Sequence, residues 1–223
     1  MPLLLAPCSL LLALCPMLSV YYLHKQMNNL RSICVYCGSA TGNNPTYASD
    51  AVALAQIFIK NNIRLVNGGG RIGLMGVMAD AILAGGGECT GLIPYSLRTK
   101  EIAHTGMTDL IVTPDMHSRK LMMVNISDAF IAFPGGFGTL DEVFETLTWA
   151  QLRLHQKPVI LYNPSGFFDA LLQQANHMVK EGFLNPGSRA LLMATDKLNE
   201  LIPMLMAFSP PATDKWANTK SSL

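Results

Sequence analysis

The chain has 223 residues, half of them hydrophobic, which is enough apolar material for one domain with a sizeable core. Its 16 Lys and Arg residues nearly balance its 15 Asp and Glu residues, and the formal net charge is +1. Proteins that bind nucleic acid polymers carry a clear basic excess, so a small-molecule ligand suits this sequence better.

An apolar run over residues 3–23 opens the chain. Its length of about 20 residues is that of a membrane span or a signal peptide. However, no Lys or Arg precedes Lys25, and no clear cleavage site follows the run. A third interpretation is that translation begins at Met27, directly before the globular domain. We favour this one and expect a cytoplasmic protein; contact with a membrane is expected only if the run is genuine.

Strand-like and helix-like segments alternate through the rest of the chain. The expected strands are residues 33–37, 64–67, 89–93, 109–113, 128–133, 157–162 and 190–194. The expected helices are one that begins at Pro45 and those over residues 73–83, 115–127, 139–152, 167–180 and 198–208. Such alternation is typical of right-handed βαβ units and a parallel sheet.

We therefore predict an α/β fold, a Rossmann-like doubly wound parallel sheet with helices on both faces. The predicted organisation is an apolar extension over residues 1–28, a single nucleotide-binding catalytic domain over 29–208 and a loose polar tail over 209–223.

Three glycine-rich turns follow expected strands, at the edge where parallel sheets bind ligands. They are Gly38-Ser39, Gly68-Gly69-Gly70 and Pro134 to Thr139. None is a GxGxxG followed by an acidic residue about 20 positions later, so NAD binding is weakly supported. The sequence also lacks GxxxxGK[ST], which excludes a Walker-type NTPase.

The turn from Pro134 to Thr139 joins an apolar strand to a helix. Its glycines allow the backbone to approach a ligand closely, and Thr139 is the expected N-cap. The free N–H groups of the first helical turn, together with the helix dipole, favour an anion such as a phosphate. Glu142 follows one turn later, within reach of a bound ligand. The pattern predicts a nucleotide-phosphate cradle with a catalytic carboxylate beside it.

The helix before the central strand begins with Met116 to Lys120, after Asp115 as expected N-cap. Arg119 and Lys120 stand out because the residues that follow are mostly apolar. They could be solvated side chains on the outer face. Alternatively, the guanidinium could bind a phosphate or ribose with bidentate geometry. His117 beside them is expected to be a structural hydrogen-bonding residue rather than a base.

Cys34 and Cys37 have CxxC spacing, but no second pair follows to complete a zinc site. A buried strand carrying small apolar cysteines explains this spacing more simply, with a redox or metal role as the alternative. The total of five cysteines gives no closed disulfide framework, which favours the reducing cytosol.

The motifs together resemble the Lonely Guy family of cytokinin-activating phosphoribohydrolases, often labelled possible lysine decarboxylases. The specific matches are MHxRK at Met116 to Lys120 and PGGxGTxxE at Pro134 to Glu142. Further matches, in order, are Cys37 to Ser39, Gly68 to Gly70 with Gly73 to Gly76, Glu101 to His104 and Thr148 to Gln151. The resemblance covers roughly residues 33–185.

The resemblance implies hydrolysis of the N-glycosidic bond of an adenosine 5′-monophosphate, typically with an N6-isoprenoid group, to the free base and ribose 5-phosphate. It implies Arg119 and Glu142 as catalytic residues. A carboxylate can stabilise the oxocarbenium-like transition state and help to activate water, while a guanidinium can hold the ribose phosphate or stabilise charge on the departing base. The implied substrate-binding residues are Ser39, Gly69, Glu101, Met116, Lys120, Gly135, Gly136, Gly138, Thr139 and Thr148. No metal and no cofactor is required.

Two other functions would also be consistent with parts of the sequence. Amino acid decarboxylation usually needs a pyridoxal-phosphate lysine with its supporting residues, and no such set is evident. A non-catalytic nucleotide-binding or sensing module on the same fold is the alternative, because a fold does not determine a function.

The sequence departs from the family at Asn67, where an aromatic residue is common, at Arg71, where Ser is frequent, and at Asp141, where many relatives have Glu. An extra cation at Arg71 could alter substrate preference. The helix after the central turn is more apolar than one sheet-packing face requires. With the dimers known in the family, this pattern predicts a homodimer or a higher homo-oligomer.

Overall fold

A computed structural model describes residues 30–98 and 102–211 of the chain. The predicted extension, most of the predicted tail and Glu101 lie outside the described residues. In chain order the elements are β1 (Ser32–Tyr36), α2 (Thr46–Lys60), β2 (Arg64–Asn67), α3 (Gly73–Ala84), β3 (Cys89–Pro94), α4 (Tyr95–Arg98), β4 (Asp109–Thr113), α5 (Met116–Ile126), β5 (Ala129–Ala132), α6 (Phe137–Gln151), β6 (Val159–Tyr162), η1 (Pro164–Gly166), α7 (Asp169–Lys180), α8 (Pro186–Ala190), β7 (Leu192–Thr195) and α9 (Leu198–Ala207).

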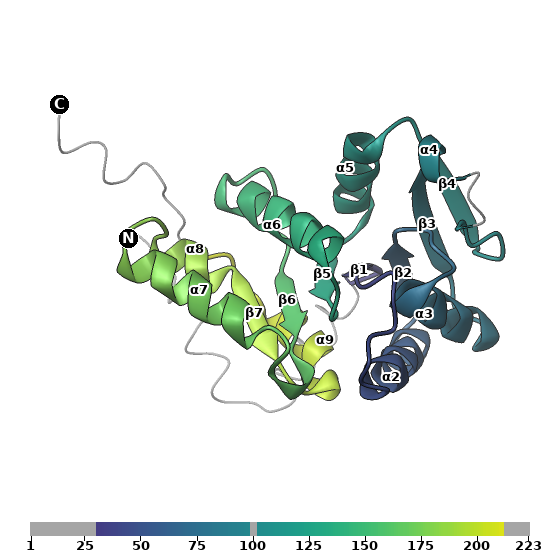
Figure 1. Ribbon diagram of the computed structural model, residues 1–223, viewed down its shortest axis with the longest axis horizontal. Coiled ribbons are helices and arrows are strands. Elements are labelled where there is room, and N and C mark those ends of the chain that lie inside the picture. Colours follow the sequence, from purple (N-terminus) through teal and green to yellow (C-terminus); the bar gives the residue numbers. More distant parts are fainter. Residues whose placement is uncertain (1–29, 99–101, 212–223) are drawn as a thin grey trace, which may run out of the picture.

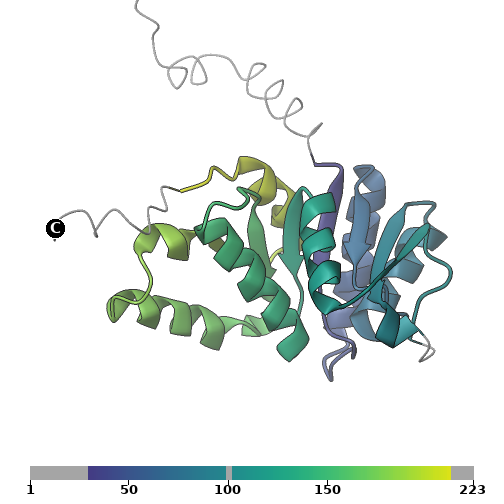
Figure 2. The same ribbon diagram turned by 90° about the horizontal axis from the view of Figure 1, so that it is seen from above.

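The described strands form one seven-stranded sheet in the order β4-β3-β2-β1-β5-β6-β7, and every pairing is parallel. Helices α2, α3 and α9 cover one face, while α5, α6 and α7 cover the other (Figures 1 and 2). The predicted Rossmann-like doubly wound fold is therefore confirmed. The strand order reverses between β1 and β5, and ligands of such sheets bind at the carboxyl ends of the strands beside that reversal.

Strand β1 shows how the sequence builds the two layers of the core. Ile33 packs with α2, α3 and α9, whereas Cys34 packs with α5, α6 and α7, as the alternation of side chains along a strand requires. Cys37 lies three residues after Cys34 and belongs to the first layer. The two thiols are free and buried on opposite faces, and burial raises both of their pKa values. The CxxC spacing therefore does not bring the sulfurs together.

Helix α6 begins earlier than the sequence predicted. Gly136 is its N-cap, in an extended conformation and without a side-chain cap hydrogen bond, and Phe137 is the first helical residue. The prediction of Thr139 as N-cap is therefore wrong. Thr139 is the third residue of the helix, and its buried side chain lies under Gly135. Asp115, by contrast, does cap α5, because its carboxylate accepts the Ser118 N–H at 2.7 Å.

Two short helices also differ from prediction. Helix α4 follows Pro94 directly, and α8 precedes the last strand and overlaps its expected range, 190–194, only at Ala190. Asn185 caps α8 by accepting the Ser188 N–H at 2.6 Å, and β7 then begins at Leu192. Within residues 30–98 and 102–211, no helix is both long and apolar enough to cross a membrane.

Candidate active site

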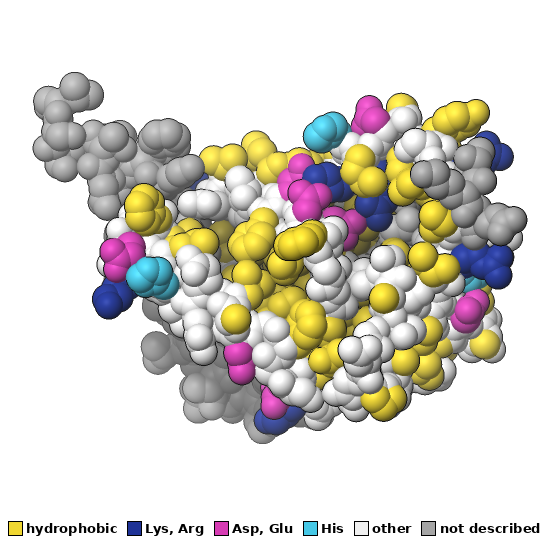
Figure 3. Space-filling model, viewed as in Figure 1, with side chains coloured by type: hydrophobic (Ala, Val, Ile, Leu, Met, Phe, Trp, Pro, Cys, Tyr) yellow, Lys and Arg dark blue, Asp and Glu magenta, His cyan; other side chains and the backbone are white. Residues whose placement is uncertain are grey.

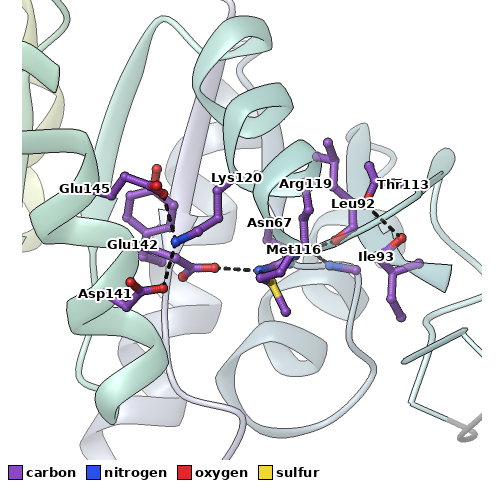
Figure 4. Close-up of polar contacts among 12 residues, drawn as sticks. Asn67, Leu92, Ile93, Thr113, Met116, Arg119, Lys120, Asp141, Glu142 and Glu145 are labelled. Carbon is purple, nitrogen blue, oxygen red and sulfur yellow. Dashed lines mark hydrogen bonds and ion pairs between the residues drawn. The ribbon is translucent and has the colours of Figure 1, made fainter. Parts of the chain in front are cut away.

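The candidate site lies where α5 and α6 meet over the carboxyl ends of the central strands. Helix α5 leads into β5, and the turn after β5 leads into α6, so the two predicted motifs flank one strand. Acidic and basic side chains gather between these two helices on the surface (Figure 3). The two predicted catalytic residues, Arg119 from α5 and Glu142 from α6, point toward each other across this gap (Figure 4).

Arg119 is held from several sides. Its Nε donates to the Leu92 carbonyl oxygen at 2.9 Å, and its Nη1 donates to Glu142 Oε1 at 2.9 Å. Nη1 also lies 3.2 Å from the sulfur of Met116, a half-exposed residue at the rim of the candidate site. The guanidinium fills the space beside Gly68, where any Cβ would overlap it. Only 11% of the Arg119 side chain is exposed, so the interpretation of a solvated outer-face residue is wrong.

Glu142 is equally enclosed, with 11% of its side chain exposed. Burial raises the pKa of this carboxyl above its ordinary value. The charge and hydrogen bond of Arg119 lower the pKa, nearby Asp141 raises it and Lys120 lowers it, and burial prevails. A buried carboxylate beside one guanidinium is suited, in its ionised form, to stabilising positive charge and to assisting a water molecule.

Lys120 is also buried, with 10% of its side chain exposed. Its Nζ lies 3.0 Å from Asp141 Oδ2 and 3.0 Å from Glu145 Oε2, both on α6 (Figure 4). Burial lowers the pKa of Lys120, but the hydrogen bonds with the two carboxylates outweigh it and the pKa is raised. The outer-face interpretation is wrong for this lysine too. Its predicted contact with substrate stays a prediction.

The turn before α6 packs against the turn after β1. The Gly38 N–H donates to the Pro134 carbonyl oxygen at 3.0 Å, and Gly135 sits so close to Thr139 that a Cβ would overlap the threonine side chain. Gly136 and Gly138 are exposed, and a Cβ on either would meet nothing within 4 Å. In the first helical turn, the N–H groups of residues 137–139 have no acceptor within the helix.

A hollow of about 300 Å³ adjoins this turn. It is lined by residues 38–42, Tyr47, Leu74, residues 134–136 and Phe167. The hollow thus brings the predicted Ser39, Gly135 and Gly136 together at the switch between β1 and β5. An exposed helix start beside such a hollow can hold a phosphate.

Replacing Gly135 with Ala should lower the melting temperature, because the new Cβ meets the Thr139 side chain and the Gly38 nitrogen. Overpacking of this kind costs about 1–3 kcal/mol. Gly138→Ala is the matched control, since its Cβ has open space and Ala favours a helix over Gly. Thermal unfolding of both variants checks this prediction. Equal melting temperatures would contradict the tight packing of Gly135.

The Gly68-Gly69-Gly70 turn lies against the Arg119 guanidinium and forms one wall of the candidate site. Asn67 is buried and fastens this turn, since its Oδ1 accepts the Gly69 N–H at 2.9 Å and its Nδ2 donates to the Met75 carbonyl oxygen at 3.3 Å. Gly69 has φ +72°, and its carbonyl oxygen accepts the His104 N–H at 2.9 Å. Both backbone groups of Gly69 are thus engaged within the protein. Asn67 therefore stabilises the conformation of this glycine turn, a role that its sequence position did not indicate.

The remaining residues singled out lie apart from the Arg119–Glu142 pair. Thr148 is exposed on α6, and its hydroxyl donates to the Phe144 carbonyl oxygen at 2.7 Å. Arg71 is exposed and its backbone N–H donates to the Ile102 carbonyl oxygen at 2.7 Å. His117 is exposed at the start of α5, and within the described residues its side chain forms no hydrogen bond. Across residues 30–98 and 102–211, no group of three or more His, Cys, Asp or Glu residues is placed to hold a metal ion.

Two contributors to the site were not predicted. The Leu92 carbonyl oxygen that holds Arg119 carries no side-chain signal in the sequence. Glu145 could have been found, because Asp141 and Glu145 are four residues apart and therefore share one face of a helix.

The chain matches known proteins over most of its length. Residues 75–205 match a family described as possible lysine decarboxylase. The chain is 41% identical to cytokinin riboside 5′-monophosphate phosphoribohydrolase LOG1 of Arabidopsis thaliana over 194 residues, which are 87% of this chain and 91% of that protein. It is 43% identical to the probable enzyme LOGL3 of Oryza sativa subsp. japonica over 185 residues, or 83% of this chain and 88% of that protein.

Among solved structures, the chain resembles a molybdenum cofactor binding protein from the phototrophic bacterium Rippkaea orientalis, with a TM-score of 0.60 and 24% identity. The similarity covers 78% of this chain and 94% of that one, and it shows the fold alone. The sequence relatives are more specific, because they share 41% and 43% of their residues with this chain over most of both lengths. The chain, with its paired Arg119 and Glu142, therefore belongs to the Lonely Guy family of cytokinin riboside 5′-monophosphate phosphoribohydrolases.

Proposed function

We propose that this protein hydrolyses the N-glycosidic bond of N6-substituted adenosine 5′-monophosphates to the free base and ribose 5-phosphate. The observation that carries the proposal is the buried pair of Arg119 and Glu142, 2.9 Å apart, next to a glycine turn that opens a helix. The relatives at about 40% identity are named for this reaction on cytokinin riboside 5′-monophosphates.

In this proposal the 5′-phosphate rests on the N–H groups at the start of α6, near Ser39 and Gly136 to Thr139. The ribose then extends along α6 toward Glu142, which lies one turn further. This direction follows from the turn and the carboxylate sharing one helix. Met116 lies at the rim on the Arg119 side, where it would contact the base. Glu101 remains a proposed contact by its match to the family.

The chemistry follows from the charges. The bond between C1′ and the base nitrogen breaks, its electron pair leaves with the base, and positive charge develops on the ribose ring. Ionised Glu142 stabilises that charge and accepts a proton from the water that adds to C1′. Arg119 keeps Glu142 ionised and stabilises negative charge on the departing base, which finally takes up a proton.

The test is product analysis with isopentenyladenosine 5′-monophosphate, AMP and isopentenyladenosine without phosphate. We expect equal amounts of free base and ribose 5-phosphate from the N6-substituted nucleotide. We expect little from the nucleoside, because its phosphate anchor is missing. The amount from AMP measures the preference for the N6 group. Tight nucleotide binding with no free base would instead support a non-catalytic binding module on this fold.

We also propose that a second copy of the chain covers α5 and α6. Leu121 on α5, Phe144 on α6 and Leu152, the C-cap of α6, are 49%, 39% and 43% exposed. The helices lie side by side on one face of the sheet (Figures 1 and 2). Thr148 lies on α6 between Phe144 and Leu152, at four-residue spacing, so it shares their outward stripe. A contact between Thr148 and nucleotide would then be made from the second copy.

Light scattering should give a mass of about twice the 24.2 kDa of one chain. Phe144→Asp should shift the protein toward monomer, because it places a charge in the apolar stripe. Phe183→Asp is the matched control, since Phe183 is 87% exposed in the segment between α7 and α8. A monomer at all concentrations, or equal behaviour of the two variants, would contradict this interface.

We place the protein in the cytoplasm. Cys34, Cys37 and Cys89 are buried and unpaired thiols, which fit a reducing compartment. Recovery of the activity in the membrane pellet on cell fractionation would contradict this location.

A further inference from the structure

Two sets of ion pairs lie next to each other between α5 and α6. Arg119 meets Glu142, and the next residue on α5, Lys120, meets Asp141 and Glu145 on either side of Glu142 in the α6 sequence (Figure 4). The second set is therefore tied to the first by the geometry of the same two helices.

The Lys120 ammonium is occupied within the protein. It sits at 3.0 Å from each carboxylate, and its side chain is 10% exposed. Asp141 is 61% exposed and Glu145 is 25% exposed, so the lysine reaches outward from under α5 to the surface of α6. An ammonium that lies between two carboxylates is poorly placed to neutralise a phosphate at the start of α6 as well.

We propose that Lys120 is a positioning residue: by pairing with Asp141 and Glu145 it holds α5 and α6 at the spacing where Arg119 meets Glu142, and it offsets the negative charge beside Glu142. The proposed role in catalysis rests on the proposed hydrolase function. The contact geometry itself does not, because it consists of ion pairs between side chains of the protein.

The charges that face Glu142 come from three elements. Helix α6 contributes Asp141 and Glu145, and α5 contributes Arg119 and Lys120. Strand β1 contributes Cys34 and Tyr36, and Cys37 follows directly after it. Burial raises the pKa values of these two thiols and of the phenol, so they stay neutral. Among the lesser influences on the pKa of Glu142, Asp141 raises it and Lys120 lowers it. Removing the lysine charge and removing the aspartate charge should therefore have opposite effects.

The experiment compares the pH dependence of kcat/KM for Lys120→Met, Asp141→Asn and the double variant, with isopentenyladenosine 5′-monophosphate as substrate. Ionised Glu142 is the active form, so its pKa sets the acid limb. We expect Lys120→Met to move this limb to higher pH and Asp141→Asn to lower pH, each by roughly one unit. The double variant should return toward the parent. KM should change by less than about threefold, while kcat of Lys120→Met falls.

Lys197→Met is the matched control. It removes an exposed lysine that pairs with Glu200 at 3.0 Å, far along the chain from α5 and α6, and it should leave the acid limb in place. Lys120→Arg should restore most of kcat, because it keeps the charge between the carboxylates. A Lys120→Met variant with a KM raised tenfold or more and an unmoved acid limb would overturn the proposal and place Lys120 on the substrate.

A second measurement tests the effect of Lys120 on Glu142 without relying on hydrolase activity. Carbon-13 carboxyl NMR can follow the titration of Glu142 in the full chain, with Glu142→Gln used to assign the signal. If the parent releases no free base, the hydrolase proposal fails, and opposite shifts of this titration still support the charge-setting role. If Lys120→Met does not fold, Asp141→Asn alone decides: a Glu142 pKa that does not fall would overturn the proposal.

Discussion

Glu142→Gln should lower the rate of base release by about 10²–10⁴-fold, the range expected when a general base is removed. The amide can still accept the hydrogen bond from Arg119 Nη1, so the fold and nucleotide binding should be retained. What is lost is the negative charge that stabilises the oxocarbenium-like transition state and the base that takes a proton from water. The measurement is kcat with isopentenyladenosine 5′-monophosphate, with nucleotide affinity measured in parallel.

The pKa of Glu142 also predicts how the activity of the parent protein depends on pH. Burial raises the pKa of Glu142, and only the ionised carboxylate is active. Activity should therefore fall with decreasing pH through a value above the ordinary glutamate pKa of about 4.3. Glu200→Gln is the control and should leave kcat unchanged, because Glu200 is a half-exposed carboxylate paired with Lys197. A Glu142→Gln variant that keeps half of the parent rate would rule out this role.

Arg119→Lys should lower kcat by about 10²–10³-fold, the loss expected when one electrostatic donor is removed from a reaction centre. The guanidinium uses Nε for the Leu92 carbonyl oxygen and Nη1 for Glu142 at the same time. A lysine ammonium is a point charge on a flexible stem and cannot reproduce this fork. Steady-state kinetics of the variant provides the measurement.

Arg189→Lys is a closely matched control. Arg189 likewise uses two nitrogens, with Nε on Asn176 and Nη1 on the Leu192 carbonyl oxygen at 2.8 Å, but it lies by β7. We expect this variant to keep the parent kcat. If Arg119→Lys were as active as Arg189→Lys, the bidentate hold on Glu142 and Leu92 would have no part in the reaction.

Much of the fold could be read from the sequence because apolar strands alternate with helical segments separated by glycine turns. The catalytic roles of Arg119 and Glu142 are implied by the resemblance to the family. Their proximity is explained by the topology, because they stand on the two helices that flank one central strand. A parallel sheet brings such helix and strand ends to one edge. The hydrogen bond between them then follows from the packing of α5 beside α6.

Other features could not be predicted from the sequence, because they depend on backbone conformation and on how the helices pack. Thr139 has the chemistry of an N-cap, but Gly136 takes the extended conformation that starts the helix, and Thr139 is needed for packing under Gly135. Lys120 resembles a phosphate ligand in sequence, and only the helix spacing shows the two carboxylates around it. The hold on Arg119 by the Leu92 carbonyl oxygen depends on a backbone atom, which the residue type does not reveal.

The central claim is that the Arg119–Glu142 pair breaks a glycosidic bond in a nucleotide held at the start of α6. Its most direct test is a single-turnover experiment with isopentenyladenosine 5′-monophosphate and excess protein, for the parent and for Glu142→Gln. We predict that the parent releases one free base and one ribose 5-phosphate per bound nucleotide, and that Glu142→Gln binds the nucleotide and leaves it intact. A parent protein that binds the nucleotide and returns it unchanged would contradict the claim.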